Sequence, residues 1–291
     1  MKPMAIFRPI WRASFRLIFF GAIIGFALLP HPGDAPAQAV ERPNIVVIML
    51  DDLDVESLDL MVEAGFMPNF QEHILDRGIS FSESFVTNAL CCPSRATYLT
   101  GQYAHNHKVL GNTLPEGPWG EEGEGILWWD LFGDGELDRD FEGENETIAV
   151  WMQNAGYNTG YVGKYLNGYG KETAIDHIPP GWSNWQGLLD PGTYCMYNYS
   201  IYDSQDDTIS VYTSDGRIKR VRDGELIEVV RVDNWTDNYQ TDVLAQRSVE
   251  FIAESAQVGA PFFLTIMPLA PHVELCGNIP FEWAGGRYPV S

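Results

Sequence analysis

The chain contains short runs of consecutive apolar residues, most of them β-branched or aromatic. Two long runs occupy residues 44–50 and 261–267, and a shorter one occupies residues 159–162. An unbroken apolar run, in contrast to an alternating one, is typical of a strand covered on both faces in a parallel sheet. The pattern therefore predicts a parallel sheet that lies between two layers of helices.

Helical periodicity marks two segments between these runs. The apolar residues with helical spacing are Ile148, Trp151, Met152 and Ala155 in one segment, and Val243, Leu244, Phe251 and Ile252 in the other. Gly156 can end the first helix, and Thr241 or Asp242 can begin the second. Strands that alternate with helices favour an α/β fold, here with a mostly parallel sheet flanked by helices.

Two segments depart from this alternation. Residues 116–146 are rich in Asp, Glu and Gly, which predicts a solvated surface loop. Residues 208–232 contain Asp215-Gly216 and Asp223-Gly224, and an Asp-Gly pair between alternating residues is a strong hairpin signal. We therefore expect a small antiparallel insertion near residues 208–232.

The first 39 residues have the order of a cleavable signal peptide. A start that contains Lys2 and three arginines precedes an uncharged apolar run at residues 17–29, and alanines at 35, 37 and 39 follow. The apolar run is shorter than the roughly 20 residues of a membrane span, although an uncleaved anchor is the alternative. We expect a secreted, periplasmic or other extracytoplasmic protein with no stable membrane anchor.

Charge and cysteine content narrow the possible partners. The formal net charge is −22, so nucleic acid is excluded as an expected partner, and an anionic substrate would need a local basic pocket. The four cysteines lack the spacing of a zinc site. Cys195 and Cys276 can form a disulfide in an exported protein, but the sequence leaves this open.

Asp51 and Asp52 directly follow the apolar run at residues 44–50. Such residues lie at the carboxyl edge of the sheet, where open α/β sheets place their ligand sites. Adjacent carboxylates repel each other unless a cation holds them, and their hard oxygen atoms suit Ca²⁺ or Mg²⁺. The alternative is a helix N-cap with an acidic first turn.

A second candidate site lies in residues 91–101, Cys-Cys-Pro-Ser-Arg-Ala-Thr-Tyr-Leu-Thr-Gly. Pro93 fits the first turn of a helix and Gly101 fits its end, so Cys91 would lie at the helix N-terminus. That end of a helix favours negative charge and can bind an anion. The alternative is a buried cysteine pair in a packed turn.

These residues carry a resemblance to a known family. Cys91, with Pro two places on and Arg four places on, resembles the C-x-P-x-R signature of type I sulfatases, members of the alkaline-phosphatase-like superfamily. Residues 42–52, 156–167 and 270–272 resemble further blocks of that family. The chain is most similar to its N-acetylglucosamine-6-sulfatase and heparan endosulfatase branch, over roughly residues 42–272.

The resemblance implies specific chemistry. Cys91 would be oxidised to 3-oxoalanine (formylglycine) by a formylglycine-generating enzyme, and its hydrated aldehyde would attack the sulfur of a sulfate ester. Asp51, Asp52 and position 91 would hold Ca²⁺, in preference to Mg²⁺, and Arg95 would orient position 91. Lys164, Asn167 and His272 would contact the substrate, a sulfated carbohydrate or other sulfate ester.

Other roles remain open for the candidate residues. Lys164 could be a surface lysine, and His272 could be a structural histidine after a strand. Lys164 and His272 are nevertheless counted with Cys91 and Arg95 as catalytic candidates. We expect structural roles for His105 and His107, because histidines that pack in loops are commoner than ligands.

The resemblance is incomplete at the C-terminal side. The family takes two more metal ligands from a strand well beyond the block at residues 270–272, and residues 273–291 match the family poorly. We therefore expect residues 40–291 to be an incomplete N-terminal catalytic domain, truncated at the C-terminus, with little or no activity alone. The alternatives are a phosphonate or phosphodiester hydrolase of the same superfamily and a non-catalytic, degenerate fragment.

Overall fold

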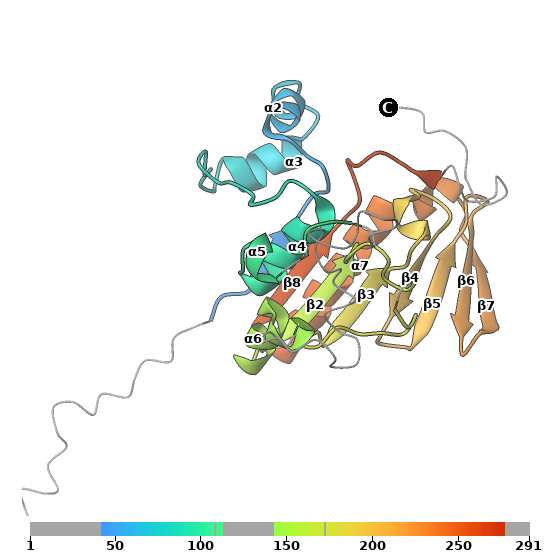
Figure 1. Cartoon of the computed structure of the whole chain (residues 1–291). Coiled ribbons are helices and arrows are strands. Elements are labelled where there is room, and N and C mark those ends of the chain that lie inside the picture. The colour runs from blue at the N-terminus through green and yellow to red at the C-terminus, as the bar shows by residue number, and fades with distance from the viewer. Residues whose placement is uncertain (1–41, 108, 113–142, 172, 277–291) are drawn as a thin grey trace, which may run out of the picture. The chain divides into compact units, whose positions relative to one another are not determined.

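The structure is a computed structural model that describes residues 42–107, 109–112, 143–171 and 173–276 (Figure 1). The expected signal peptide, residues 1–39, and most of the expected acidic loop lie outside the described residues. Among the residues described, no helix is long and apolar enough to cross a membrane.

A single mixed sheet organises the described chain. Its strands lie in the order β1-β8-β2-β3-β4-β5-β6-β7, which can be followed across Figure 1. In that order they are β1 (Ile45–Ile48), β8 (Phe262–Met267), β2 (Asn158–Gly163), β3 (Asn184–Leu188), β4 (Tyr199–Asp203), β5 (Thr208–Tyr212), β6 (Arg217–Arg222) and β7 (Glu225–Arg231). The predicted α/β fold is confirmed, and all three apolar runs form strands of this sheet.

The first four strands are parallel and carry the core. β8 pairs in parallel with both β1 and β2, and β2 pairs in parallel with β3. Successive residues of β2 point to opposite faces, so Tyr161 packs with α4 and α6 while Val162 packs with α7. Helices therefore cover both faces of the parallel half, as the unbroken apolar runs predict.

The remaining strands are antiparallel and form a meander. β4, β5, β6 and β7 pair in sequence order, beginning with the antiparallel pairing of β4 to β3. The β6–β7 turn is Asp223-Gly224, with φ of 52° and 78°, the left-handed conformations that a two-residue hairpin turn requires. Residues 208–231 thus extend the sheet by three antiparallel strands.

Helices connect and cover the strands. The longer ones are α2 (Val55–Glu63), α4 (Cys91–Thr100), α6 (Ile148–Asn154) and α7 (Gln240–Val258), and the short ones are α3 (Pro68–Phe70), η2 (Gln71–Leu75), α5 (Ala104–His107), η4 (Gly143–Glu146), η5 (Gly192–Tyr194) and η6 (Trp235–Asn238). α6 and α7 correspond to the two segments of helical periodicity. The N-cap of α2 is Asp54, whose carboxylate accepts a hydrogen bond from Ser57 N at 2.8 Å. Neither Asp51 nor Asp52 therefore has the N-cap role considered as the alternative.

The expectation of burial on both faces is wrong for β1 in the part of the chain that the structure describes. β1 lies at one edge of the sheet, and Val46 and Ile48 remain 44% and 60% exposed. Ile45 and Val47, on the other face, pack against the core. An apolar run indicates that the residues of a strand can be buried, but it does not identify the element that covers each face of the strand.

An aromatic cluster supports the sheet beneath its carboxyl edge. Trp185 is fully buried, stacks on Tyr161 with ring centroids 4.5 Å apart, and donates a hydrogen bond to Tyr169 OH at 2.7 Å. We expect Trp185→Ala to lower the free energy of unfolding by about 3–5 kcal/mol, because a large cavity would remain. Urea denaturation followed by circular dichroism would measure this change.

Trp151 is the matched control for this substitution, because it is half exposed on the surface of α6. Trp151→Ala should change the same free energy by less than about 1 kcal/mol. Equal losses of unfolding free energy in the two variants would contradict the conclusion that Trp185 stabilises the core.

A buried carboxylate joins η4 to the loop after β2. Glu144 accepts hydrogen bonds from Tyr165 OH at 3.1 Å and from His177 Nε2 at 2.7 Å. The hydrogen bond to Glu144 raises the pKa of His177, and burial opposes this only in part. The protonated form of His177 therefore stabilises the folded state.

This pair predicts a pH-dependent stability. Because the folded pKa of His177 is raised, its contribution is complete below the unfolded pKa of about 6.5 and is lost as the pH rises through the folded value. We expect the stability difference between the wild type and His177→Gln to be largest near pH 6 and to shrink at higher pH. Urea midpoints measured across this range would test it, and a constant difference would contradict it.

Candidate active site

The side chains singled out from the sequence meet at the carboxyl edge of the parallel strands. Asp51 follows β1 and forms an isolated parallel bridge with Pro271, the residue before His272. Lys164 directly follows β2, and His272 follows β8. Because β8 lies between β1 and β2, the ends of these three neighbouring strands bring the residues together.

Cys91 enters this group from α4. It is the first residue of the helix, whose last residue, Thr100, is followed by Gly101 as the C-cap. Cys91 Sγ lies 3.6 Å from Asp51 Oδ1 and 3.5 Å from Lys164 Nζ. The side chain is partly exposed, so the sulfur lies between a carboxylate and an ammonium group at a site that solvent reaches.

Cys92 occupies a different environment from its neighbour. It is buried, and its sulfur accepts a hydrogen bond from Asn167 N at 3.2 Å. Burial raises the pKa of the Cys92 thiol to about 11, so this residue stays neutral. The alternative of two equivalent buried cysteines does not hold, because only Cys92 is buried.

Asp51 is a buried carboxylate with two cationic partners. Its Oδ2 accepts a hydrogen bond from Lys164 Nζ at 2.6 Å, and its Oδ1 lies 3.4 Å from Arg95 Nη2. Burial alone would raise the pKa of Asp51, but the charges of Arg95 and Lys164 outweigh burial and lower it. Asp51 is therefore ionised at neutral pH.

Arg95 lies one helical turn after Cys91 and is buried. Besides Asp51, its Nη1 donates hydrogen bonds to the carbonyl oxygens of Lys164, at 2.5 Å, and Tyr165, at 3.3 Å. The guanidinium group thus joins α4 to the segment that follows β2. Its contacts fit a role in holding Asp51 and Lys164 in place.

Lys164 is buried, with only 1% of it exposed, and its ammonium group contacts both Asp51 and Cys91. The preceding residue, Gly163, has φ of 119°, and a Cβ there would lie 2.1 Å from the carbonyl oxygen of Met267. Only glycine permits this close approach between β2 and β8. The backbone before Lys164 is therefore fixed against β8.

His272 and Asp52 form a second, more exposed pair. Asp52, with φ of 61°, has its Oδ2 3.4 Å from His272 Nε2. His272 Nδ1 lies 2.6 Å from the carbonyl oxygen of Val273, which can only accept, so Nδ1 carries a hydrogen. The ring nitrogen that faces Asp52 is therefore Nε2.

The other candidate residues lie at the margin of this group. The backbone of Asn167 contacts Cys92, which places Asn167 beside the start of α4. His107 is buried against Thr97 and accepts a hydrogen bond from Val109 N, and His105 stacks on Tyr103. These contacts fit the structural roles expected for both histidines.

The described residues do not by themselves fit a calcium ion. The described group of three neighbouring metal-ligating residues consists of Asp51, Cys91 and His272, whose ligand atoms lie within 4.8 Å of one another. This set offers one carboxylate, one sulfur and one ring nitrogen, whereas Ca²⁺ takes six to eight oxygen ligands. Asp52, the other expected ligand, faces His272.

Position 91 does fit an oxidised, oxygen-bearing side chain. A developing negative charge there would lie beside Lys164 Nζ and at the first residue of α4, where the helix N-terminus favours it. Partial exposure leaves room for a substrate to approach. The arrangement can therefore support a nucleophile at position 91 next to a bound anion.

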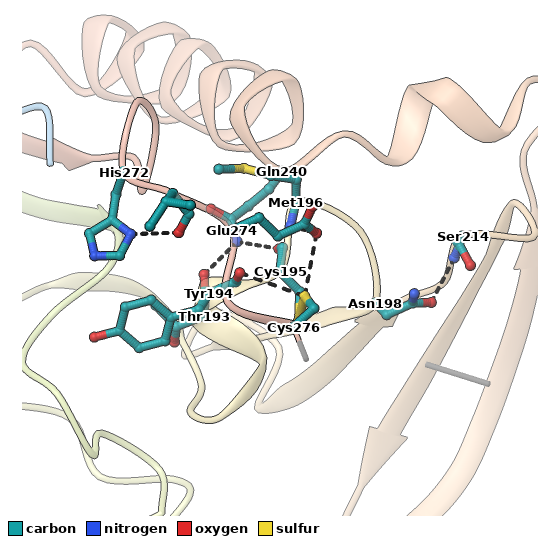
Figure 2. Close-up of a disulfide and its surroundings, with 11 residues drawn as sticks. Thr193, Tyr194, Cys195, Met196, Asn198, Ser214, Gln240, His272, Glu274 and Cys276 are labelled. Atoms are coloured by element: carbon teal, nitrogen blue, oxygen red, sulfur yellow. Dashed lines mark hydrogen bonds between the residues drawn. A yellow bond between two sulfur atoms is a disulfide. The ribbon is translucent and has the colours of Figure 1, made fainter. Parts of the chain in front are cut away.

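Tyr194 contacts the site but has no sequence motif. Its ring lies under Lys164 Nζ, 4.6 Å from the ammonium to the ring centroid, and next to the ring of His272, with centroids 5.4 Å apart. Cys195, the following residue, forms a disulfide with Cys276 (Figure 2). The sequence left this pairing open, and no motif in it points to Tyr194.

Comparisons with known proteins show the family to which the chain belongs. A family model described as "Sulfatase" matches residues 43–291. The chain is 35% identical to N-acetylglucosamine-6-sulfatase of Homo sapiens over 240 residues, which is 81% of this chain and 35% of that protein. It is 31% identical to an arylsulfatase of Volvox carteri, over 88% of this chain and 32% of that protein.

A third relative is the extracellular sulfatase SULF-1 homolog of Drosophila melanogaster. The chain is 32% identical to it, over 82% of this chain and 17% of that protein. The chain thus spans about a third or less of the length of these three relatives.

Proposed function

Because the chain belongs to the sulfatase family, we propose that it contributes the nucleophile, an anion-binding lysine and a proton donor to the hydrolysis of a sulfate ester. The observation that carries this proposal is the cluster of Cys91, Asp51 and Lys164. The sulfur, the carboxylate and the ammonium group each lie within 3.6 Å of the other two. A partly exposed nucleophile between a carboxylate and a buried ammonium group suits attack on an anionic ester.

The proposed nucleophile is formylglycine, made from Cys91 by a formylglycine-generating enzyme. In that form, residue 91 would supply a hydrated aldehyde whose hydroxyl group attacks sulfur. Asp51, which is ionised and lies beside this position, can accept a hydrogen bond from such a hydroxyl group and orient it. Arg95 lies against the same carboxylate oxygen, Oδ1, and Lys164 holds Oδ2, so the two cations keep Asp51 in place.

Lys164 is proposed to bind the sulfate oxygens. Its ammonium group already lies within hydrogen-bonding distance of position 91, so an ester bound there would meet the nucleophile at short range. Burial strengthens the attraction between Lys164 and an anion, because solvent screens it weakly.

His272 is proposed to protonate the departing alcohol. Its Nδ1–H is held by the carbonyl oxygen of Val273, which leaves Nε2 to carry the transferable proton. Asp52 lies next to this nitrogen and can hold the ring in this orientation. Asn167 is retained as a further substrate contact, since its backbone adjoins the start of α4.

We retain calcium as the proposed cofactor of the complete protein, with Asp51, Asp52 and position 91 among its ligands. Further oxygen ligands, beyond those of Asp51, Asp52 and position 91, are proposed to come from other parts of the complete protein. The substrate class is proposed to be a sulfated carbohydrate, because one relative is named N-acetylglucosamine-6-sulfatase. Export from the cytoplasm is proposed from the leader-like residues 1–39 and the relative named extracellular sulfatase.

The domain boundaries are likewise proposals. We propose that residues 1–39 are removed as a signal peptide and that residues 40–291 belong to the N-terminal catalytic domain of a sulfatase. The antiparallel strands β5, β6 and β7 would be an insertion at the edge of that domain.

The proposal is tested by producing the complete protein together with a formylglycine-generating enzyme. Release of sulfate from N-acetylglucosamine 6-sulfate and from an aryl sulfate would be measured beside hydrolysis of an aryl phosphodiester. We expect turnover of sulfate esters in preference to the phosphodiester. A preference for the phosphodiester would assign the chain to the phosphonate and phosphodiester hydrolases, and hydrolysis of neither would leave only anion binding.

A further inference from the structure

Tyr194 lies where two of the proposed reaction groups meet. Its ring contacts the ammonium group of Lys164 on one side and the imidazole of His272 on another, at 4.6 Å and 5.4 Å from the ring centroid. Lys164 is otherwise held by Asp51 and Cys91. An aromatic face attracts a cation through its quadrupole, so Tyr194 limits where the flexible lysine side chain can lie.

The backbone around Tyr194 is held from one side by α7. The side-chain amide of Gln240 donates to the carbonyl oxygens of Thr193 and Cys195, both at 2.9 Å, and Gln240 N donates to Met196 O at 2.9 Å. These hydrogen bonds flank Tyr194 on both sides along the chain (Figure 2). Gln240 is fully buried, so water cannot replace these bonds easily.

The segment that carries His272 holds Tyr194 from the other side. Cys195 is joined to Cys276 by the disulfide, and Leu275 N donates to the carbonyl oxygen of Tyr194 at 3.1 Å. The carboxylate of Glu274 accepts a hydrogen bond from Met196 N at 3.1 Å. Tyr194 and His272 therefore belong to two segments that one covalent bond and two hydrogen bonds tie together; Figure 2 shows the disulfide and the contact of Glu274 with Met196.

We propose that Tyr194 is a positioning residue whose ring, anchored by the Cys195–Cys276 disulfide, holds the Lys164 ammonium group and the His272 imidazole where they act on a sulfate ester. Its contribution to turnover rests on the proposed function, whereas its effect on the position of Lys164 does not. The loop at residues 192–196 thereby becomes part of the reaction site, although it contributes no group that reacts.

The first test separates the aromatic face from simple packing. Tyr194→Leu removes the ring, and Tyr194→Phe keeps it. Tyr197→Leu is the control, because Tyr197 is a nearby buried tyrosine whose ring packs against Tyr239 and not against Lys164. The resonances of the Lys164 side chain carry a ring-current shift in NMR spectra. We expect this shift to vanish in Tyr194→Leu and to persist in Tyr194→Phe and in Tyr197→Leu.

Kinetics supply the second readout in the same proteins. We expect Tyr194→Leu to raise KM for a sulfate ester and lower kcat, with a combined loss of kcat/KM of about tenfold, the fold-change of a partly desolvated cation–π contact. Tyr194→Phe should restore values near those of the wild type. The proposal would be overturned if kcat/KM fell in both Tyr194→Leu and Tyr197→Leu in proportion to their unfolded fractions and if Tyr194→Phe did not restore it. Packing would then be the only role of Tyr194.

The anchor is tested by Cys276→Ser, which breaks the disulfide without altering the ring. We expect this variant to reduce the Lys164 ring-current shift and kcat/KM in the same direction as Tyr194→Leu. Adding Tyr194→Leu to Cys276→Ser should then cause little further loss, because both changes act through one contact. Fully additive losses would overturn the role of the disulfide as the anchor.

The outcomes also separate this proposal from the proposed function. A Lys164 shift that depends on Tyr194, in a protein without sulfate ester turnover, would support the positioning and refute the function. A Lys164 shift that is unchanged in both Tyr194→Leu and Cys276→Ser would refute the positioning, whatever the turnover. If Tyr194→Leu does not fold, Cys276→Ser and Tyr194→Phe still provide these comparisons.

Discussion

Replacing Cys91 with alanine is expected to abolish sulfate ester hydrolysis. The residue supplies the proposed nucleophile, and loss of a nucleophile costs other hydrolases roughly six orders of magnitude in kcat. Anion binding should survive, because Lys164 and its partner Asp51 remain. Sulfate release would be measured beside the affinity for inorganic sulfate, in the complete protein produced with a formylglycine-generating enzyme.

Cys92→Ala is the matched control for this prediction. Cys92 is the neighbouring thiol, but it is buried and its pKa is raised to about 11, so it should not provide a nucleophile. A hydrazide reagent should label an aldehyde in the peptide that contains position 91 in Cys92→Ala, and not in Cys91→Ala. Sulfate ester turnover that persists in Cys91→Ala would contradict the proposed mechanism.

Replacing Lys164 with methionine is expected to damage both stability and substrate binding. The change removes the closest cationic partner of buried Asp51, and breaking a buried ion pair costs roughly 3–5 kcal/mol. Arg95 remains as a second partner, so we expect the lower end of that range. The affinity for inorganic sulfate should also fall in Lys164→Met, because the proposed anion-binding group is gone.

The stability loss in Lys164→Met should also depend on pH. The charges of Arg95 and Lys164 lower the pKa of Asp51 against the effect of burial, so this contribution is present above the unfolded pKa and is lost as the pH falls. Without Lys164 the pKa of Asp51 should rise, and acid unfolding should begin at a higher pH. Unfolding midpoints measured between neutral and acidic pH would show this shift.

The double variant Asp51→Asn/Lys164→Met provides the control for charge. Removing both charges should cost less stability than removing Lys164 alone, because no uncompensated buried carboxylate remains. The double variant should still lack high sulfate affinity. If its stability loss equalled the sum of the two single losses, the ion pair would not be the source of the effect.

The parallel half of the sheet could be predicted because its strands are apolar on both faces. Residues 44–50, 159–162 and 261–267 became β1, β2 and β8. The order of these strands could not be predicted, since nothing in an apolar run states that β8 lies between the other two. The exposure of Val46 and Ile48 shows the same limit, because an apolar pattern does not identify the covering element.

The site was predictable where a local motif carries the chemistry. The spacing of Cys91 and Arg95 places them one turn apart on α4, and Asp51 follows a strand that is visible in the sequence. Tyr194 could not be found in this way. The segment around it is joined by a disulfide between residues 81 apart and receives hydrogen bonds from α7, and none of these contacts has a local signature.

The place of β8 in the sheet also determines when the site can form during synthesis of the protein. β1 and β2 do not pair with each other, and each pairs with β8, which ends at Met267. A ribosome-bound chain therefore cannot close the parallel half until residue 267 has emerged, and contacts between such distant residues form slowly. Asp51 and Lys164 should consequently meet only late in folding, whereas the antiparallel meander can assemble beforehand.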